Sequence, residues 1–243
     1  MLNWVNHLGN VAWERARMRT PEETAGGPHY VPALGYHFLT PLYDTVIALM
    51  TRESTWRKAL VKQIAADQRD VIVDVGCGTG TLAVMLKRAS PYTTVYGIDP
   101  DPGVLGLAEI KARDKGVLVH FMQGYGAEVA ERAASLRVTK VVSSLVLHQV
   151  PLDGKREILA NMHAALKPGG EIHIADYGLQ RSALMRLLFR QIQNLDGYRA
   201  TQANADGIVP VLMEEIGFDG VRENRVIATP TGSISLYSGR KAA

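Results

Sequence analysis

The chain has 243 residues, 47% of them hydrophobic and 21% charged, and its net charge is +3. The length suits one globular domain with an elaboration or two. Basic and acidic residues are interspersed and no Lys/Arg block occurs, so we predict no nucleic-acid partner. The single cysteine excludes an internal disulfide and a cysteine metal cluster. It favours a reducing compartment, and we expect no metal site.

No apolar run approaches the roughly 18 residues that a membrane helix needs, so we predict no integral membrane segment. Near the N-terminus, Glu14, Arg15 and Arg17 interrupt the apolar residues and argue against a signal peptide. We therefore expect a cytoplasmic protein that is a monomer or a homodimer.

The first 66 residues are predicted to form an N-terminal helical cap. Residues 1–19 carry apolar side chains at a helical period, and residues 20–35 break that pattern with proline and glycine. Helical periodicity returns after Tyr43 and continues to Ile64, where Ser54 is a candidate cap and Trp56 a candidate core residue.

Residues 71–80 are the most informative stretch of the chain. A β-branched, apolar run at 71–75 predicts a central parallel strand buried on both faces. Gly76, Gly78 and Gly80 follow at alternate positions, and a helical pattern begins at once. Such a turn brings its backbone, and the N-terminus of the next helix, close to a nucleotide-type ligand. The glycine spacing differs from the G-x-G-x-x-G of dinucleotide sites, and Asp74 would repel a pyrophosphate but suits a cationic cofactor.

The sequence V-D-V-G-C-G-T-G at 73–80 closely resembles the first motif of class I S-adenosylmethionine-dependent methyltransferases. The resemblance implies that Asp74 helps to hold the amino-acid end of the cofactor and that Gly76, Cys77 and Gly78 wrap around it. Cys77 is interpreted as a small packing residue and not as a nucleophile.

A second strand is predicted at 94–99, and its last residue, Asp99, can accept hydrogen bonds from both ribose hydroxyls of a bound nucleoside. That role suits NAD as well as S-adenosylmethionine. Pro100 and the residues after it open a helix. A third strand at 117–122 leads to Gly124 and Tyr125. Family members often have an aspartate at the place of Tyr125, so here either Tyr125 packs near the adenine or backbone groups contact it.

A fourth strand is predicted at 140–145 and resembles the fourth motif of the family, which places Ser144 and Leu145 beside the transferable methyl group. His148 follows, and two interpretations stay open. With an ordinary pKa near 6.5 it could act as a general base, or it could only shape the loop. Tyr177, after the fifth strand, is a second candidate base.

The rest of the chain completes the pattern. A turn at 167–170 launches a fifth strand at 171–176, and Asp153 is a candidate cap of the helix before it. Residues 179–206 are predicted to be an insertion that walls the acceptor pocket. A helix at 208–216 and strands at 221–228 and 233–239 end the chain. The predicted fold is α/β, a Rossmann-like seven-stranded mostly parallel sheet with helices on both faces and a C-terminal antiparallel pair, in a methyltransferase domain spanning 67–243.

We therefore predict S-adenosylmethionine-dependent methyl transfer to an O, N, S or C nucleophile of a small-molecule acceptor. The alternatives are an NAD(P)-linked oxidoreductase and a non-catalytic subunit that binds S-adenosylmethionine. Tyr43 resembles a tyrosine that reaches the cofactor in quinone-pathway methyltransferases, and residues 29–43 are predicted to enclose the acceptor. The predicted acceptor contacts are Tyr30, Tyr36, His37, His148 and Tyr177.

Overall fold

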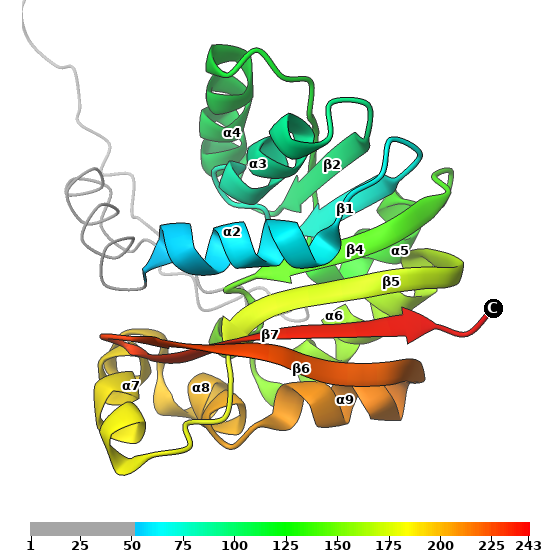
Figure 1. Ribbon diagram of the computed structural model, residues 1–243. Helices are drawn as coiled ribbons and strands as arrows, with labels where there is room; N and C mark the ends of the chain where they lie inside the picture. Colours follow the sequence, from blue (N-terminus) through cyan, green and yellow to red (C-terminus); the bar gives the residue numbers. More distant parts are fainter. Residues whose placement is uncertain (1–51) are drawn as a thin grey trace, which may run out of the picture. The chain divides into compact units, whose positions relative to one another are not determined.

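The computed structural model describes residues 52–243, which form a seven-stranded sheet in the order β3-β2-β1-β4-β5-β7-β6 (Figure 1). The first five strands are parallel, and β7 is antiparallel to both of its neighbours. The predicted fold class is therefore confirmed. The strands are β1 (Val71–Val75), β2 (Thr94–Asp99), β3 (His120–Gln123), β4 (Val138–Ser144), β5 (Leu166–Tyr177), β6 (Phe218–Thr229) and β7 (Gly232–Lys241).

Helices cover both faces of this sheet (Figure 1). The described helices are α2 (Glu53–Ile64), α3 (Thr81–Ala89), α4 (Pro102–Asp114), α5 (Val129–Arg132), α6 (Leu152–Ala165), α7 (Ala183–Asp196), α8 (Tyr198–Ala205) and α9 (Ile208–Ile216). Two 3₁₀ turns, η1 (Gly126–Glu128) and η2 (Leu147–Gln149), follow the third and fourth strands. Within residues 52–243, no helix is long and apolar enough to span a bilayer.

Two apolar cores lie on the two faces of the sheet, because successive strand residues point to opposite sides. In β1, Ile72 belongs to one core together with Trp56 of α2 and Leu82 of α3. Val73 and Val75 belong to the other core. Since both faces are covered, β1 is apolar at every position except Asp74 and does not alternate with polar residues.

Helix α2 belongs to the first of these cores. Its residues Trp56, Leu60 and Ile64 are fully buried, which confirms Trp56 as a core residue. Ser54 does not cap the helix, because α2 begins at Glu53 after Arg52. This helix is the described part of the predicted cap. Residues 1–51, and with them the candidate site residues Tyr30, Tyr36, His37 and Tyr43, lie outside the described part of the chain.

Several boundaries differ from the sequence-based expectation. The third strand spans only 120–123, because pairing with β2 begins at His120. The expected turn at 167–170 lies inside β5 as an irregularity, where the pairing with β4 shifts register and Gly169 has a φ of 73°. Helix α6 begins one residue before Asp153, which is therefore not its cap. Helix α8 was not expected. Strands β1 and β2 and helix α9 match their predicted bounds.

Candidate functional site

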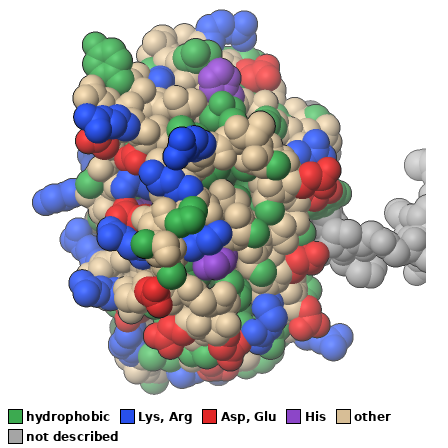
Figure 2. Space-filling view, turned by 90° about the vertical axis from the view of Figure 1, so that its right-hand side faces the viewer, with side chains coloured by type: hydrophobic (Ala, Val, Ile, Leu, Met, Phe, Trp, Pro, Cys, Tyr) green, Lys and Arg blue, Asp and Glu red, His purple; other side chains and the backbone are tan. Residues whose placement is uncertain are grey.

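The candidate site lies at the carboxyl ends of β2, β1, β4 and β5, which are neighbours in the sheet. These ends point to the left in Figure 1. Figure 2 looks at the opposite edge, where basic and acidic side chains are interspersed. In open α/β sheets, ligands bind beyond the carboxyl ends of the strands. The residues predicted from the first, second and fourth strands are therefore brought together at one edge.

The glycine loop after β1 has three left-handed glycines with different surroundings. Gly76 (φ 70°) and Gly80 (φ 70°) are tightly packed, since a Cβ on Gly76 would lie 2.3 Å from Val146 and one on Gly80 would lie 2.9 Å from Phe121. At Gly78 (φ 52°), no atom of the described residues lies within 4 Å of the same position. Gly76 and Gly80 therefore serve packing, whereas Gly78 borders open space.

Asp74 is an unpaired acid in the interior, directly before this loop. It is fully buried, and neither carboxylate oxygen has a hydrogen-bond partner of ordinary geometry among the described residues. Burial is the main cause that raises the pKa of Asp74 to about 7, while the nearby Arg57 guanidinium lowers it and the Asp99 carboxylate raises it. A buried carboxylate without a partner is expensive, so a native one needs an explanation such as an unseen cationic partner.

Asp99 connects the end of β2 to the glycine loop. Its Oδ2 accepts a hydrogen bond from the backbone N–H of Gly78 at 2.8 Å, and its Oδ1 accepts one from the N–H of Asp101 at 3.0 Å. Burial raises the pKa of Asp99, and these two backbone hydrogen bonds oppose the shift. A carboxylate has about four acceptor positions, so two hydrogen bonds leave Asp99 able to accept more. Asp101, in turn, caps α4 by accepting from Gly103 at 2.7 Å.

The thiol of Cys77 is buried inside the loop. Burial is the main cause that raises the pKa of this thiol, and the carboxylates of Asp74 and Asp99 raise it further. The side chain also fills the space over Gly97, where a Cβ would lie 2.8 Å from the sulfur. A protonated thiol in close packing is a poor nucleophile, in agreement with the interpretation of Cys77 as a packing residue.

The loop after β3 approaches the same edge through backbone contacts. The N–H of Gly124 donates to the carbonyl oxygen of Asp99 at 3.1 Å, and the Gln123 amide donates to the carbonyl oxygen of Pro100 at 3.1 Å. Tyr125 opens η1 with 38% of its surface exposed, and its N–H donates to Glu128. Its ring is therefore accessible at the edge where the resemblance places an adenine.

At the tip of β4 the backbone takes an unusual conformation. Leu145, next to Ser144, has a φ of 56°, which is rare for a residue with a side chain. Its N–H donates to the carbonyl oxygen of Ala175 at 2.9 Å, which holds the strained turn against β5. Strain of this kind is concentrated at functional sites. The side chain of Leu145 is only partly buried and lies against the first core.

His148 lies in η2 between two acids. Its Nδ1 donates to Asp176 at 2.7 Å, and its Nε2 lies 3.3 Å from Asp196 of α7. Burial alone would lower the pKa of His148, but the two carboxylates raise it to about 9. The expectation of a base that titrates near 6.5 is thus replaced by an imidazolium at neutral pH. With both nitrogens engaged and only 3% of its surface exposed, His148 has no proton-accepting atom to offer a substrate.

Three charged residues of this cluster were missed in the sequence. Asp176, at the end of β5, also accepts from the N–H groups of Val146, Leu147 and Tyr177. Lys155 of α6 is buried and donates to the carbonyl oxygens of Leu147, Val150 and Ala200. Burial lowers the pKa of Lys155 to about 8. One signal was available for it, because Lys155 occupies the core-facing helical series that continues with Ile158, Leu159 and Met162. Asp196 gave no such signal.

Tyr177 is a core residue at this edge. It is 1% exposed, and its hydroxyl is hydrogen-bonded to Thr231 at 2.8 Å while its ring contacts those of His148 and Phe189. Burial raises the pKa of Tyr177 above its usual range. A phenol of this kind does not ionise near neutral pH. The geometry therefore supports a packing role for Tyr177 and gives no support to its prediction as a base.

The sequence and the fold were compared with those of known proteins. A family model described as a methyltransferase domain matches residues 72–170. This stretch is similar to a methyltransferase domain. The match includes β1, the glycine loop and the tips of β2 and β4, and so contains most of the residues described above. The resemblance predicted from residues 73–80 is confirmed.

Two curated relatives of this chain are named as methyltransferases. An uncharacterized methyltransferase of Emericella nidulans is 28% identical over 178 residues, which are 64% of this chain and 61% of that protein. A demethylmenaquinone methyltransferase of Deinococcus radiodurans is 27% identical over 154 residues, which are 63% of this chain and 62% of that protein. The chain thus spans about three fifths of the length of these relatives.

The solved structures support the fold. The magnesium protoporphyrin IX methyltransferase of Synechocystis PCC 6803, determined with bound SAH, has a TM-score of 0.60 and 17% identity. The match covers 78% of this chain and 84% of that one. At this identity the likeness shows the fold alone.

Proposed function

We propose that the protein is an S-adenosylmethionine-dependent methyltransferase that acts on a small molecule. The single observation that carries the proposal is Asp74, a buried carboxylate with no hydrogen-bond partner of ordinary geometry among the described residues, two positions before a glycine loop that borders open space. A cationic amino group would supply the missing partner. The methyltransferase family match and its curated relatives support the same cofactor.

The residues at the sheet edge fit the parts of this cofactor. Asp74 would pair with the ammonium of its amino-acid end, and the loop at 76–78 would border that end. Asp99, with acceptor positions left after two backbone hydrogen bonds, would bind the ribose hydroxyls. Gly124 and the accessible Tyr125 would lie at the adenine, and Ser144 and Leu145 near the reacting group. Tyr43 remains a proposed contact from outside the described residues.

The chemistry requires little from the protein beyond alignment. The cofactor supplies a methyl group on a positively charged sulfur: the acceptor's lone pair forms the new bond, and the carbon–sulfur electron pair stays on sulfur. Holding two reactants in line is worth up to about 7–11 kcal/mol in well-oriented cases. The charged His148 and the neutral phenol of Tyr177 support a reaction without either residue as a base.

The segment 179–206 is proposed to wall the acceptor pocket. It forms α7 and α8, and two of its groups contact the elements after β4: Asp196 faces His148 of η2, and the carbonyl oxygen of Ala200 accepts from Lys155 of α6. Its attachment to the loop beside the proposed methyl position supports a role in shaping the space there. His148 would hold this wall in place. Tyr30, Tyr36 and His37 remain proposed acceptor contacts.

The test is calorimetric titration of the purified protein with S-adenosylmethionine, S-adenosylhomocysteine and NADH. We expect saturable binding of the first two and none of NADH; binding of NADH alone would identify the chain as an oxidoreductase. Incubation of small-molecule extracts with methyl-labelled cofactor, followed by mass spectrometry, then tests transfer. Cofactor binding with no labelled small molecule in any extract would contradict catalysis and support a binding subunit.

A further inference from the structure

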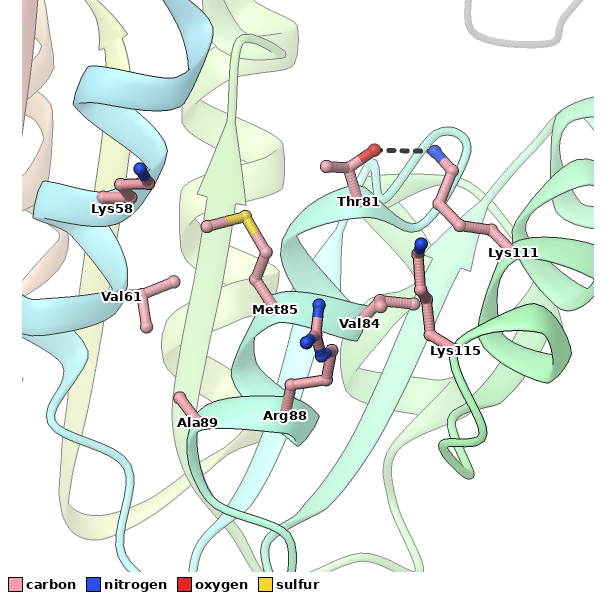
Figure 3. A pocket seen from close by; sticks show the side chains of 9 residues that line it. All are labelled: Lys58, Val61, Thr81, Val84, Met85, Arg88, Ala89, Lys111 and Lys115. Carbon is pink, nitrogen blue, oxygen red and sulfur yellow. Dashed lines mark hydrogen bonds between the residues drawn. The ribbon is translucent and has the colours of Figure 1, made fainter.

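We propose that the groove between α2, α3 and α4 binds a phosphate-bearing small molecule. This groove lies over the outer surface of α3 and has a volume of about 380 Å³. Such a volume falls within the range of small-molecule pockets. It is lined by Lys58, Val61, Thr81, Val84, Met85, Arg88, Ala89, Lys111 and Lys115 (Figure 3).

The lining is unusually rich in positive charge. Lys58, Arg88, Lys111 and Lys115 are four of its nine residues, and no Asp or Glu is among them. The whole chain, in contrast, is nearly balanced, with 27 basic and 24 acidic residues. Within residues 52–243, Lys58, Arg88 and Lys115 have no ion-pair partner. Like charges gathered without counter-charges repel one another, and a bound anion would relieve the repulsion.

The arrangement of the side chains indicates the class of anion. Figure 3 shows Arg88 of α3 and Lys115 extending alongside Val84, while Lys58 comes from the opposite side on α2. Arg binds phosphate oxygens in pairs, and Lys adds a point charge. The groove is also lined by the apolar side chains of Val61, Val84, Met85 and Ala89. A molecule with a phosphate group on an apolar body would match both the cationic and the apolar side chains of the groove.

Two features favour a small ligand over a nucleic acid. Among the described residues, the lining holds no aromatic side chain on which a base could stack. The groove is also bounded by three helices and so does not form a long track. The shared chemistry, a phosphate on an apolar body, occurs both in soluble metabolites and in lipid headgroups.

The groove is next to the proposed cofactor loop but separate from it. Lys111 donates to the hydroxyls of Thr79 and Thr81, at 2.8 and 2.7 Å, and so holds the end of the glycine loop. The test therefore leaves Lys111 unchanged. Its outcome does not depend on whether the protein binds S-adenosylmethionine, because the ligand is measured directly.

The experiment is calorimetric titration of the full chain at low salt with inorganic diphosphate and, separately, with octyl phosphate. We expect saturable binding of both at one site. The double variant Lys58→Gln/Arg88→Gln should bind each about 10–100-fold more weakly, because two charge-assisted contacts are lost. The control is Arg222→Gln/Arg225→Gln, which removes the same charge from the exposed side of β6, at the far edge of the sheet. It should bind within about twofold of the wild type.

Flotation with phosphatidylcholine vesicles, with and without phosphatidic acid, distinguishes the two sources of the phosphate. If vesicle binding requires phosphatidic acid and is lost without Lys58 and Arg88, the ligand is a lipid headgroup. If the protein binds only the free phosphates, the ligand is a soluble molecule. Absence of saturable binding to every probe would overturn the proposal. An equal loss of affinity in the groove variant and the control variant would also overturn the proposal, because the affinity would then depend on net charge and not on the groove. Thermal melts of all variants establish that they fold.

Discussion

The carboxylate of Asp99 accepts a hydrogen bond from the backbone N–H of Gly78 at 2.8 Å, so the tip of β2 holds the glycine loop that follows β1. Both the loop and the carboxylate are in the proposed cofactor site. Asp99 therefore has two roles to separate, one in positioning the loop and one in binding the ribose. Truncation to alanine would remove both roles at once, and a conservative substitution is the better test.

Asp99→Asn is expected to weaken the binding of S-adenosylmethionine by about 1.5–3 kcal/mol, because the amide loses one charged acceptor. Calorimetry on the purified variant measures this. Asp101→Asn is the matched control, since asparagine is an equally good helix cap and should preserve α4. Unchanged cofactor affinity in Asp99→Asn would remove Asp99 from the ribose site.

Gly78→Ala is expected to abolish or strongly weaken cofactor binding while the protein still folds. The new methyl group meets no atom of residues 52–243 within 4 Å and would extend into the space proposed for the ligand. Its left-handed backbone makes the substitution cost about 1–2 kcal/mol in unfolding free energy. Gly116→Ala is the control, because Gly116 has a similar φ of 64° and open surroundings. The two variants should melt alike, and only Gly78→Ala should lose binding; equal affinities would show that the space at Gly78 is not used.

Asp74→Asn is expected to change stability and binding in opposite directions. The folded-state pKa of Asp74 is raised to about 7 from 3.8, so ionisation destabilises the native state as pH rises. The free energy of unfolding of the variant should thus equal that of the wild type near pH 4. It should exceed the wild-type value by roughly 2–4 kcal/mol at pH 7. Denaturant melts across this range measure it. The same variant should bind S-adenosylmethionine more weakly; a variant that binds equally well would leave Asp74 without a role in the site.

His148 is expected to remain protonated through neutral pH. An NMR titration of its ring should give a midpoint near 9, and Asp196→Asn should lower that midpoint because one carboxylate is lost. Because the pKa is higher in the folded state, protonation of His148 stabilises the fold. This contribution is complete below pH 6.5 and is lost as the pH rises through 9. The stability difference between the wild type and His148→Gln should therefore shrink over that window. A midpoint near 6.5 would contradict the effect assigned to the two acids.

Turnover is expected to show no rise with pH between 6 and 7, because His148 is already protonated there and offers no nitrogen to accept a proton. His148→Gln should lower turnover mainly by loosening the loop after β4, and the shape of its pH profile should match that of the wild type. The measurement is initial rate against pH at saturating cofactor. A wild-type rate that rises through a pKa near 6–7, and a variant that loses this rise along with about 10²–10⁴-fold in rate, would restore His148 as a general base.

Sequence patterns were sufficient to predict the central strands and the edge of the sheet at which the site lies. The apolar run at 71–75 and the acid at 99 follow from local patterns, and parallel strands necessarily place their tips together. Local patterns failed where tertiary contacts prevailed. The residues at 167–170 favour a turn, and they form an unpaired irregularity inside β5 because pairing with β4 exists on both sides of them, at Leu166 and again from Glu171. The partners of His148 come from positions 28 and 48 residues away, and no periodicity connects them.

Asp176, His148 and Lys155 are buried, and together with the partly buried Asp196 they carry two negative and two positive charges when all four are ionised. Replacement of one of the four leaves an uncompensated charge in the interior, which destabilises a protein by about 3–5 kcal/mol. The four residues lie in β5, η2, α7 and α6. Substitutions at these positions are therefore expected to occur together. Descendants of this sequence that change one of them should carry a compensating change in another, and a segment grafted at 179–206 should be accepted only if it brings an acid to face His148.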